Sequence, residues 1–204
     1  MASISVAGDS SGSITIAAPA VAGSGTLTLP VATDTLIGKA TTDTLTNKSI
    51  AATQLTGTIA ASALPAGSVL QVVQGTYSTA ISTSSASYVT TNLTASITPR
   101  SASSKILISV SFPSTNQNLG NQVTATIYRG ATNLSVSGTN LNGFGQTYNG
   151  AGNSQANYSM CFLDSPSTTS STTYTAYYAS TNTGTVAAFI NNQTGTITLM
   201  EIAG

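Results

Sequence analysis

The sequence contains no histidine, no tryptophan and only one cysteine among its 204 residues. Without histidine, a Ser-His-Asp triad, a Cys-His pair and an imidazole metal site are all excluded. The single cysteine, Cys161, excludes a disulfide bond within the chain. Because Cys161 lies in a largely apolar run, 158–163, we expect it to be a small buried hydrophobic side chain.

Charged residues are also scarce, at 5% of the chain against about 25% in a typical soluble domain. The five basic residues are scattered and cancel the five acidic ones, so we expect no nucleic-acid partner. No run of about 18 apolar residues is present, which predicts no membrane insertion, and the N-terminus lacks the pattern of a signal peptide. The chain is nevertheless 40% hydrophobic, too apolar for a disordered protein. This combination indicates a folded protein whose apolar surface is largely covered by partner chains.

The few carboxylates leave little room for catalysis. A glycosidase needs two of them across a sugar-binding cleft, and Asp164 and Glu201 are the only acidic residues after residue 43. We expect Asp164, which precedes Ser-Pro, to cap a turn through its side chain. Glu201 is expected to pair with Arg100, Lys105 or Arg129, within the subunit or between subunits, at a gain of about 0 to 1 kcal/mol for a surface pair. The sequence therefore predicts no enzyme activity, no cofactor and no metal.

What the sequence does contain is a series of strand signals. The stretch 103–134 holds two strong ones, 106–111 and 123–128, separated by an Asn/Gly-rich connection. Their order suggests a core hairpin, but because the chain is so poor in charge we interpret them as one subunit's part of a shared core. After residue 68, eight strands are predicted at the spacing of a sandwich or jelly roll: 69–78, 88–98, 105–112, 123–129, 155–163, 172–179, 185–191 and 195–202. Alternation places Tyr174, Ala176 and Tyr178 on one face and Tyr177 on the other. The last strand is apolar on both faces, which predicts that it is central or covered by a neighbouring subunit.

The composition changes twice along the chain. In residues 1–40, short alternating bursts separated by Gly/Ser clusters predict β-hairpins of an attachment region. Residues 41–67 carry an apolar residue every four or five positions, which indicates either an extended shaft within a multi-chain bundle or a flexible linker. Residues 68–204 form the predicted C-terminal sandwich. The fold class is therefore all-β, with an antiparallel sandwich or jelly roll preceded by an extended β-rich region.

Several short sequence segments resemble those of tailed-bacteriophage fibre proteins. In the C-terminal half they are SSKILISVS (103–111), IYRGATNL (127–134), FLDSPS (162–167) followed by TTYTAY (172–177), and ITLMEIAG (197–204). In the N-terminal part, SGTLTLP (24–30) and TTDTLTNKSI (41–50) resemble shaft and attachment regions of virion fibres. The resemblance implies a jelly-roll knob, similar to tumour-necrosis-factor-like trimers, on a homotrimeric stalk. The shaft is short here, which favours a short fibre or a capsid-bound decoration over a long tail fibre.

The long Gly/Asn/Gln-rich connection 136–157 is the candidate recognition segment. Long loops on a rigid β scaffold are often functional, and this one carries the candidate contact residues Phe144, Gln146, Tyr148 and Asn149. Aromatic and amide side chains bind saccharides or surface proteins by stacking and hydrogen bonds. The alternative is that Phe144 and Tyr148 anchor the loop onto its own or a neighbouring subunit.

These observations and the resemblance together favour a virion structural protein. We expect a homotrimer that binds another virion protein, of the tail or the capsid, through its N-terminal region. A host cell-surface glycan or protein is a further expected partner of the knob. The alternatives are a capsid-attached head fibre or cement protein that stabilises the shell, and, less favoured, a carbohydrate-binding adhesin or a depolymerase spike.

Overall fold

The structure is a computed structural model that describes residues 3–7, 13–17, 49–51, 53, 56–57, 59–60, 63–135, 143–148 and 153–204. The chain divides into two compact units, Met1–Thr56 and Gly57–Gly204. In the first unit, β1 (Ser3–Ala7) and β2 (Ser13–Ala17) form an antiparallel hairpin in which Ile4 lies opposite Ile16 and Val6 opposite Ile14. This hairpin confirms the strands predicted from the first two apolar bursts. The predicted bursts near Leu27, Leu29 and Leu36 lie outside the described residues.

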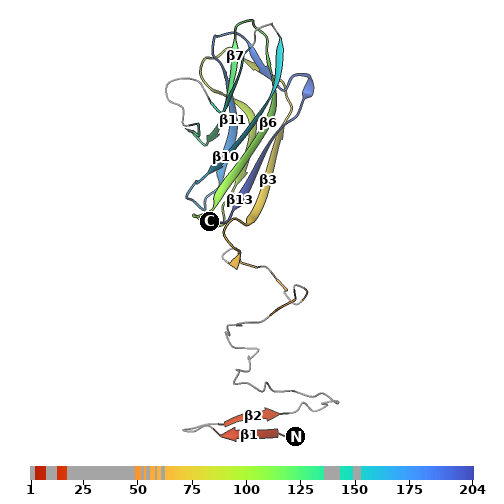
Figure 1. Ribbon diagram of the computed structural model, residues 1–204, viewed down its shortest axis with the longest axis vertical. Helices are drawn as coiled ribbons and strands as arrows, with labels where there is room; N and C mark the ends of the chain where they lie inside the picture. The colour runs from red at the N-terminus through yellow and green to blue at the C-terminus, as the bar shows by residue number, and fades with distance from the viewer. Residues whose placement is uncertain are drawn as a thin grey trace. The chain divides into compact units, whose positions relative to one another are not determined.

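The second unit is a sandwich of two antiparallel sheets (Figure 1). The six-stranded sheet contains β3 (Val69–Tyr77), β4 (Ile81–Thr83), β6 (Lys105–Asn116), β10 (Ser154–Asp164), β12 (Val186–Ala188) and β13 (Gly195–Ile202). One edge of β6 pairs with β10 along its length, and the other edge pairs first with β13 and then with β12. The twelve-residue β6 is therefore the central strand of this sheet.

The five-stranded sheet contains β5 (Val89–Ile97), β7 (Gln122–Arg129), β8 (Thr132–Asn133), β9 (Gly145–Tyr148) and β11 (Thr172–Ser180). Its central strand β11 pairs with β5 on one side and β7 on the other, and β8 and β9 both pair with β7. From β4 to β7, and again from β9 to β12, consecutive strands alternate between the two sheets, as in a jelly roll. The predicted all-β antiparallel sandwich is confirmed.

The core lies between the sheets and follows from period-two alternation. In β13, Ile197, Leu199 and Glu201 point inward and are fully buried, while Thr198 and Met200 are partly exposed on the other face. In β11, Tyr174, Ala176 and Tyr178 are buried and Tyr177 is partly exposed, as predicted. The last strand lies between β3 and β6, so the prediction that it is central is confirmed.

The two strand signals in 103–134 do not form a hairpin, and their part in a core shared between subunits stays a prediction. The two strands belong to β6 and β7, which lie in different sheets. The connection crosses between the sheets and is held by asparagine side chains: Asn116 Nδ2 donates to Asn121 O (2.7 Å), and Ser180 Oγ donates to Asn121 Oδ1 (3.0 Å). Both strands have a fully buried apolar face, so they are more stable facing each other across the core than paired side by side.

The strand predicted at 185–191 is shorter than expected. β12 ends at Ala188, and Phe189, Asn191 and Asn192 adopt left-handed backbone conformations with φ of 56°, 54° and 57°. The short 3-10 turn at Ile190–Asn192 then leads into β13. This turn brings Phe189 into the core against Phe112, with ring centroids 5.9 Å apart. The strand is thus interrupted to bury an aromatic ring.

Candidate functional site

Two hydrogen bonds to β7 hold the chain just before the predicted recognition loop 136–157 and within it. Leu134 N donates to Ile127 O (2.9 Å), and Phe144 N donates to Ala125 O (2.8 Å). The two anchor points on β7 are thus two residues apart. Gly143 is tightly enclosed at the second anchor, because a Cβ there would lie 2.0 Å from Ala125 O, and its φ is +41°.

The candidate contact residues of this loop are placed differently from one another. Phe144 is half-buried against the core and packs edge-to-face on Phe162, with ring centroids 5.4 Å apart. Gln146 and Tyr148 lie in β9 with exposed side chains, and Tyr148 is 61% exposed. Asn149 lies outside the described residues. The Phe144 contact agrees with the anchoring alternative for this residue, and recognition by Gln146 and Tyr148 stays a prediction.

A second aromatic group lies on the outward face of the five-stranded sheet. The rings of Tyr128 in β7 and Tyr177 in β11 stack with centroids 4.1 Å apart and planes at 30°. Tyr88 approaches Tyr128 edge-on at 6.3 Å, and its hydroxyl is 3.1 Å from Thr124 Oγ1. All three side chains are half-buried. We call Tyr88, Tyr128 and Tyr177 the tyrosine platform.

Burial sets the ionisation of two members of the tyrosine platform. Burial raises the pKa of Tyr88, partly offset by its hydrogen bond to Thr124. Burial also raises the pKa of Tyr128, to which the neighbouring Tyr177 adds. These phenols are therefore neutral hydrogen-bonding groups at physiological pH, because an ordinary tyrosine pKa is already about 10.

Hydroxyl groups extend from the tyrosine platform along the same face. The hydroxyls of Thr94 and Thr175 are hydrogen-bonded at 2.9 Å, and those of Ser96 and Thr173 at 2.7 Å. Opposite Ala176, next to Tyr177, β5 bulges: Asn92 has a φ of 62°, and Thr91 Oγ1 donates to Ala176 O (2.7 Å). Such bulges bend a sheet and re-aim its side chains.

Asp164 does not act as the expected turn cap. It ends β10 as a buried side chain, and both of its oxygens accept hydrogen bonds from Arg129 Nη1, at 2.9 and 2.8 Å. The Tyr174 hydroxyl donates to Asp164 Oδ2 (2.7 Å). Burial and the Asp164 hydrogen bond raise the pKa of Tyr174 well above its ordinary value. The Asp164 network ties β7, β10 and β11 together across the two sheets.

Glu201 is not paired with a cationic side chain in the described part of the subunit. Its Oε1 accepts from the backbone N–H of Arg100 (2.6 Å), and its Oε2 accepts from Gln71 Nε2 (2.6 Å). The expected pairing with Lys105 or with the guanidinium groups is therefore wrong within the chain. Burial by itself raises the pKa of the Glu201 carboxyl, but the hydrogen bonds to the charged form outweigh it and lower that pKa.

The two carboxylates of the sandwich lie in one row of the six-stranded sheet. Asp164 and Glu201 both lie opposite Ile106 of β6, one on each side. Each is buried and already holds its own hydrogen-bond partners. Ile106 separates them by two strand spacings, about 10 Å. This arrangement holds strands together and presents no free carboxylate to a substrate.

The outward face of the six-stranded sheet carries an apolar row that crosses four strands. Val72 of β3 lies opposite Met200 of β13, Met200 opposite Leu107 of β6, and Leu107 opposite Leu163 of β10. Val72 is 56% exposed and Leu163 48% exposed. We call Val72, Met200, Leu107 and Leu163 the apolar row.

The surroundings of the apolar row are uncharged apart from one lysine. Ile202 and the exposed Val69 lie opposite each other beside the row, and Lys105 lies on the far side of Ile202. The next row is Gln74, Thr198, Ser109 and Cys161. Cys161 is exposed there, so its predicted burial is wrong. Alternation along β10 buries Tyr158 and Met160 and turns Cys161 outward.

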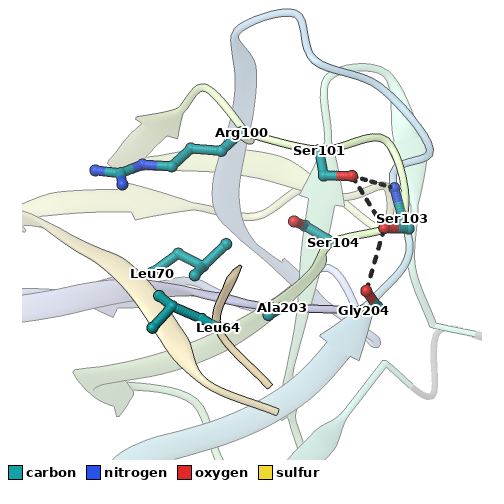
Figure 2. A pocket seen from close by; sticks show the side chains of 8 residues that line it. All are labelled: Leu64, Leu70, Arg100, Ser101, Ser103, Ser104, Ala203 and Gly204. Atoms are coloured by element: carbon teal, nitrogen blue, oxygen red, sulfur yellow. Dashed lines mark hydrogen bonds between the residues drawn. The ribbon is translucent and has the colours of Figure 1, made fainter. Parts of the chain in front are cut away.

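A hollow of about 570 Å³ lies at the end of the sandwich where β3 begins and the chain ends (Figure 2). It is lined by Leu64, Leu70, Arg100, Ser101, Ser103, Ser104, Ala203 and Gly204. The Ser101 and Ser103 hydroxyls are hydrogen-bonded at 2.9 Å, and Ser103 Oγ donates to Gly204 O (3.4 Å). The Arg100 side chain extends away from these serines (Figure 2). The Ser101 and Ser103 hydroxyls therefore bond within the protein, whereas the buried Ser104 hydroxyl has no partner among the described residues.

Sequence reasoning did not identify the tyrosine platform or the apolar row. The alternation that places Tyr177 outward was visible, and the same rule places Tyr128 outward in its strand. The sequence does not show which strands are neighbours in a sheet, because pairing joins segments that are far apart in the chain. Among the described residues, no cluster of three His, Cys, Asp or Glu side chains is arranged to hold a metal ion. No helix in this part of the chain has the length and hydropathy of a membrane span.

No protein-family model and no curated protein matches this chain. Among solved structures, it is similar to one described as the structure of the Gx strain of infectious bursal disease virus, at 13% sequence identity and a TM-score of 0.29. The similarity covers 67% of this chain and 37% of that chain. The present chain thus spans well under half the length of the chain that it matches.

Proposed function

We propose that this protein is a non-enzymatic structural protein of a bacteriophage virion, a homotrimeric short fibre. Its N-terminal region binds another virion protein, and its sandwich forms the knob. The observation that carries the proposal is the apolar row. Four neighbouring strands present it on a face whose four strands contribute only Lys105 as an outward charge.

Burial of the apolar row between subunits supplies the stabilisation. Full burial of a Leu, Val or Met side chain contributes about 1.5–3 kcal/mol, and Val72 and Leu163 are each about half exposed in the single subunit. With so few charges on the chain, little electrostatic repulsion opposes the approach of a second copy. A core that exists only in the assembly also makes stability depend on subunit concentration.

The buried carboxylates support a non-enzymatic role. Asp164 is engaged by Arg129 and Tyr174, and Glu201 by Gln71 and the backbone of Arg100. A glycosidase requires two carboxylates that flank a substrate. Here both carboxylates, Asp164 and Glu201, are buried within the sandwich.

Sedimentation of wild-type protein and of two variants tests the proposal. The molecular mass of the wild type from sedimentation should be three times the 20.4 kDa mass of one chain. Leu163→Asp should weaken the assembly at least tenfold, because it places a charge in the apolar row. The matched control is Leu119→Asp, since Leu119 is 71% exposed outside the row, and this variant should assemble normally. A stable wild-type monomer would contradict the fibre proposal.

Cys161 supplies a second measurement on the same face. It lies two residues before Leu163 on the outward side of β10 and is exposed in the single subunit. Alkylation of this thiol should therefore be slow in the assembled wild type and fast in Leu163→Asp. A trimer with a freely reactive Cys161 would show that the subunits meet through another face.

The site of attachment distinguishes a tail fibre from a capsid-bound head fibre or cement protein. The two forms share the same knob and the same N-terminal hairpin, so the subunit structure fits both. Localisation of the protein in a reconstruction of the intact virion separates them. Density at the tail supports the short tail fibre, and density on the shell supports the capsid-bound form.

A further inference from the structure

We propose that the tyrosine platform binds neutral saccharides. The inference rests on the proposed function, because it assigns the host-surface contact of the fibre to a specific face of the knob. It moves that contact from the loop residue Phe144, which packs against Phe162, to the outward face of the five-stranded sheet.

The aromatic rings are held in place, and two of their hydroxyls have no partner among the described residues. Tyr128 and Tyr177 stack at 4.1 Å, which fixes both rings. Neither of these two hydroxyls bonds to a described residue, whereas the buried Tyr174 and Tyr158 hydroxyls bond to Asp164 and Val123 O. A partly exposed ring and its phenolic hydroxyl combine an apolar surface with a donor and acceptor. Sugars present the same combination of C–H faces and hydroxyls.

The surroundings of the platform supply further hydrogen-bonding groups in fixed positions. The paired hydroxyls of Thr94 and Thr175, and of Ser96 and Thr173, line the sheet beside the rings. Thr90 lies exposed directly opposite Tyr177, next to the bulge of β5. Binding sites for small ligands typically combine an apolar surface with a few positioned polar groups of this kind.

The charge of this face matches an uncharged ligand. The strands β5 and β11 contain no charged residue, and β7 contains only Arg129. Arg129 is held by Asp164, so no free cation remains on these three strands. A phosphate-rich or acidic polymer would find no counter-charge here, and a neutral saccharide needs none.

The position of the face also fits an external ligand. The apolar row lies on the six-stranded sheet, and the tyrosine platform lies on the outward side of the other sheet. If subunits associate through the apolar row, the tyrosine platform stays on the outside of the assembly. The two faces therefore separate assembly from recognition.

A glycan array of neutral oligosaccharides, followed by calorimetric titration of the tightest array ligand, tests this inference with the full-length protein. Tyr177→Ala and Tyr128→Ala should each weaken binding about tenfold, a loss of about 1.4 kcal/mol, because each removes one of the two stacked rings. Thr90→Lys, a surface change that leaves the core intact, should also weaken binding. Tyr148→Ala tests the loop as the alternative site. The matched control is Leu119→Ala, which removes an exposed apolar side chain outside both the loop and the platform and should leave affinity unchanged.

Sedimentation of every variant keeps the two proposals distinguishable. Weaker binding by variants that remain trimeric supports the platform. The inference is overturned if the wild type binds no array saccharide, if the platform variants and Thr90→Lys bind normally, or if only Tyr148→Ala loses binding. It is also overturned if the platform variants fail to assemble, because the face is then a subunit contact. A monomeric wild type would contradict the fibre proposal. Weaker saccharide binding by the platform variants would then still support the platform, and normal binding would still overturn it.

Discussion

Replacement of Glu201 by glutamine should destabilise the protein at neutral pH and have less effect in acid. The wild-type carboxylate is fully buried and accepts two short hydrogen bonds, one from Gln71 Nε2 and one from Arg100 N, both at 2.6 Å. Glutamine supplies a single acceptor oxygen, and its NH₂ group would face a second donor. One charge-assisted hydrogen bond is therefore lost.

The magnitude follows from that lost bond. A hydrogen bond to a charged group contributes about 1.5–3 kcal/mol. For a chain of this length, each kcal/mol changes Tm by roughly 2–4 °C. Glu201→Gln should therefore lower Tm by about 3–12 °C at pH 7, at a fixed protein concentration.

The pH dependence has a defined sign. The pKa of Glu201 in the folded protein is lowered from its ordinary value of 4.5, so the unfolded chain takes up the proton at a higher pH than the folded protein. The stabilisation by the carboxylate is complete above about pH 4.5 and is lost as pH falls through the folded pKa. The Tm difference between wild type and Glu201→Gln should thus be constant from pH 8 to 6 and shrink below pH 4.5.

Circular dichroism melts from pH 8 to pH 2 measure this difference. The control is Gln193→Ala, which alters an exposed amide side chain and should change Tm by little at any pH. Equal Tm values for wild type and Glu201→Gln at pH 7 would refute the role assigned to the hydrogen bonds. A difference that persists unchanged to pH 2 would refute the assignment of the ionised form.

Two further substitutions test the core. Tyr174→Phe removes the hydroxyl that donates to Asp164 and should cost about 1.5–3 kcal/mol, measured by urea unfolding. The matched control is Tyr178→Phe, since the Tyr178 hydroxyl has no partner among the described residues and the ring is equally buried; equal losses in both variants would contradict the Asp164 network. Gly75→Ala should lower Tm by several degrees, because the new Cβ would lie 2.0 Å from the backbone oxygen of Thr94 in the facing sheet. An unchanged Tm would show that the sheets separate there at little cost.

The strand positions could be predicted because strand formation depends on local features of the sequence, above all on alternation of apolar and polar residues. Alternation in 172–179 and 195–202 located β11 and β13 to within one residue and assigned their buried faces correctly. The short strands β4, β8 and β9 were missed. They have three, two and four residues, too few for alternation to be recognised.

The candidate sites were much less predictable. The Asp164 network depends on Arg129, 35 residues earlier in the chain, and no local pattern links the two. Cys161 was expected inside because its neighbours are apolar, yet those neighbours occupy the inward positions and turn the thiol outward. Phe144 and Tyr148 looked equivalent in the sequence, and the fold buries part of one and exposes the other.

Local sequence patterns were enough to establish that this chain forms β-strands, that it has almost no charged surface, and which side chains of each strand share a face. These properties depend on residue type and on a period of two, both of which are local. Tertiary folding was needed to place β6 and β7 in opposite sheets and to align one apolar residue from each of four strands into a row. It likewise decided that Tyr128 stacks on Tyr177. Strand order and register arise from burial of all the apolar faces at once, so no single segment encodes them.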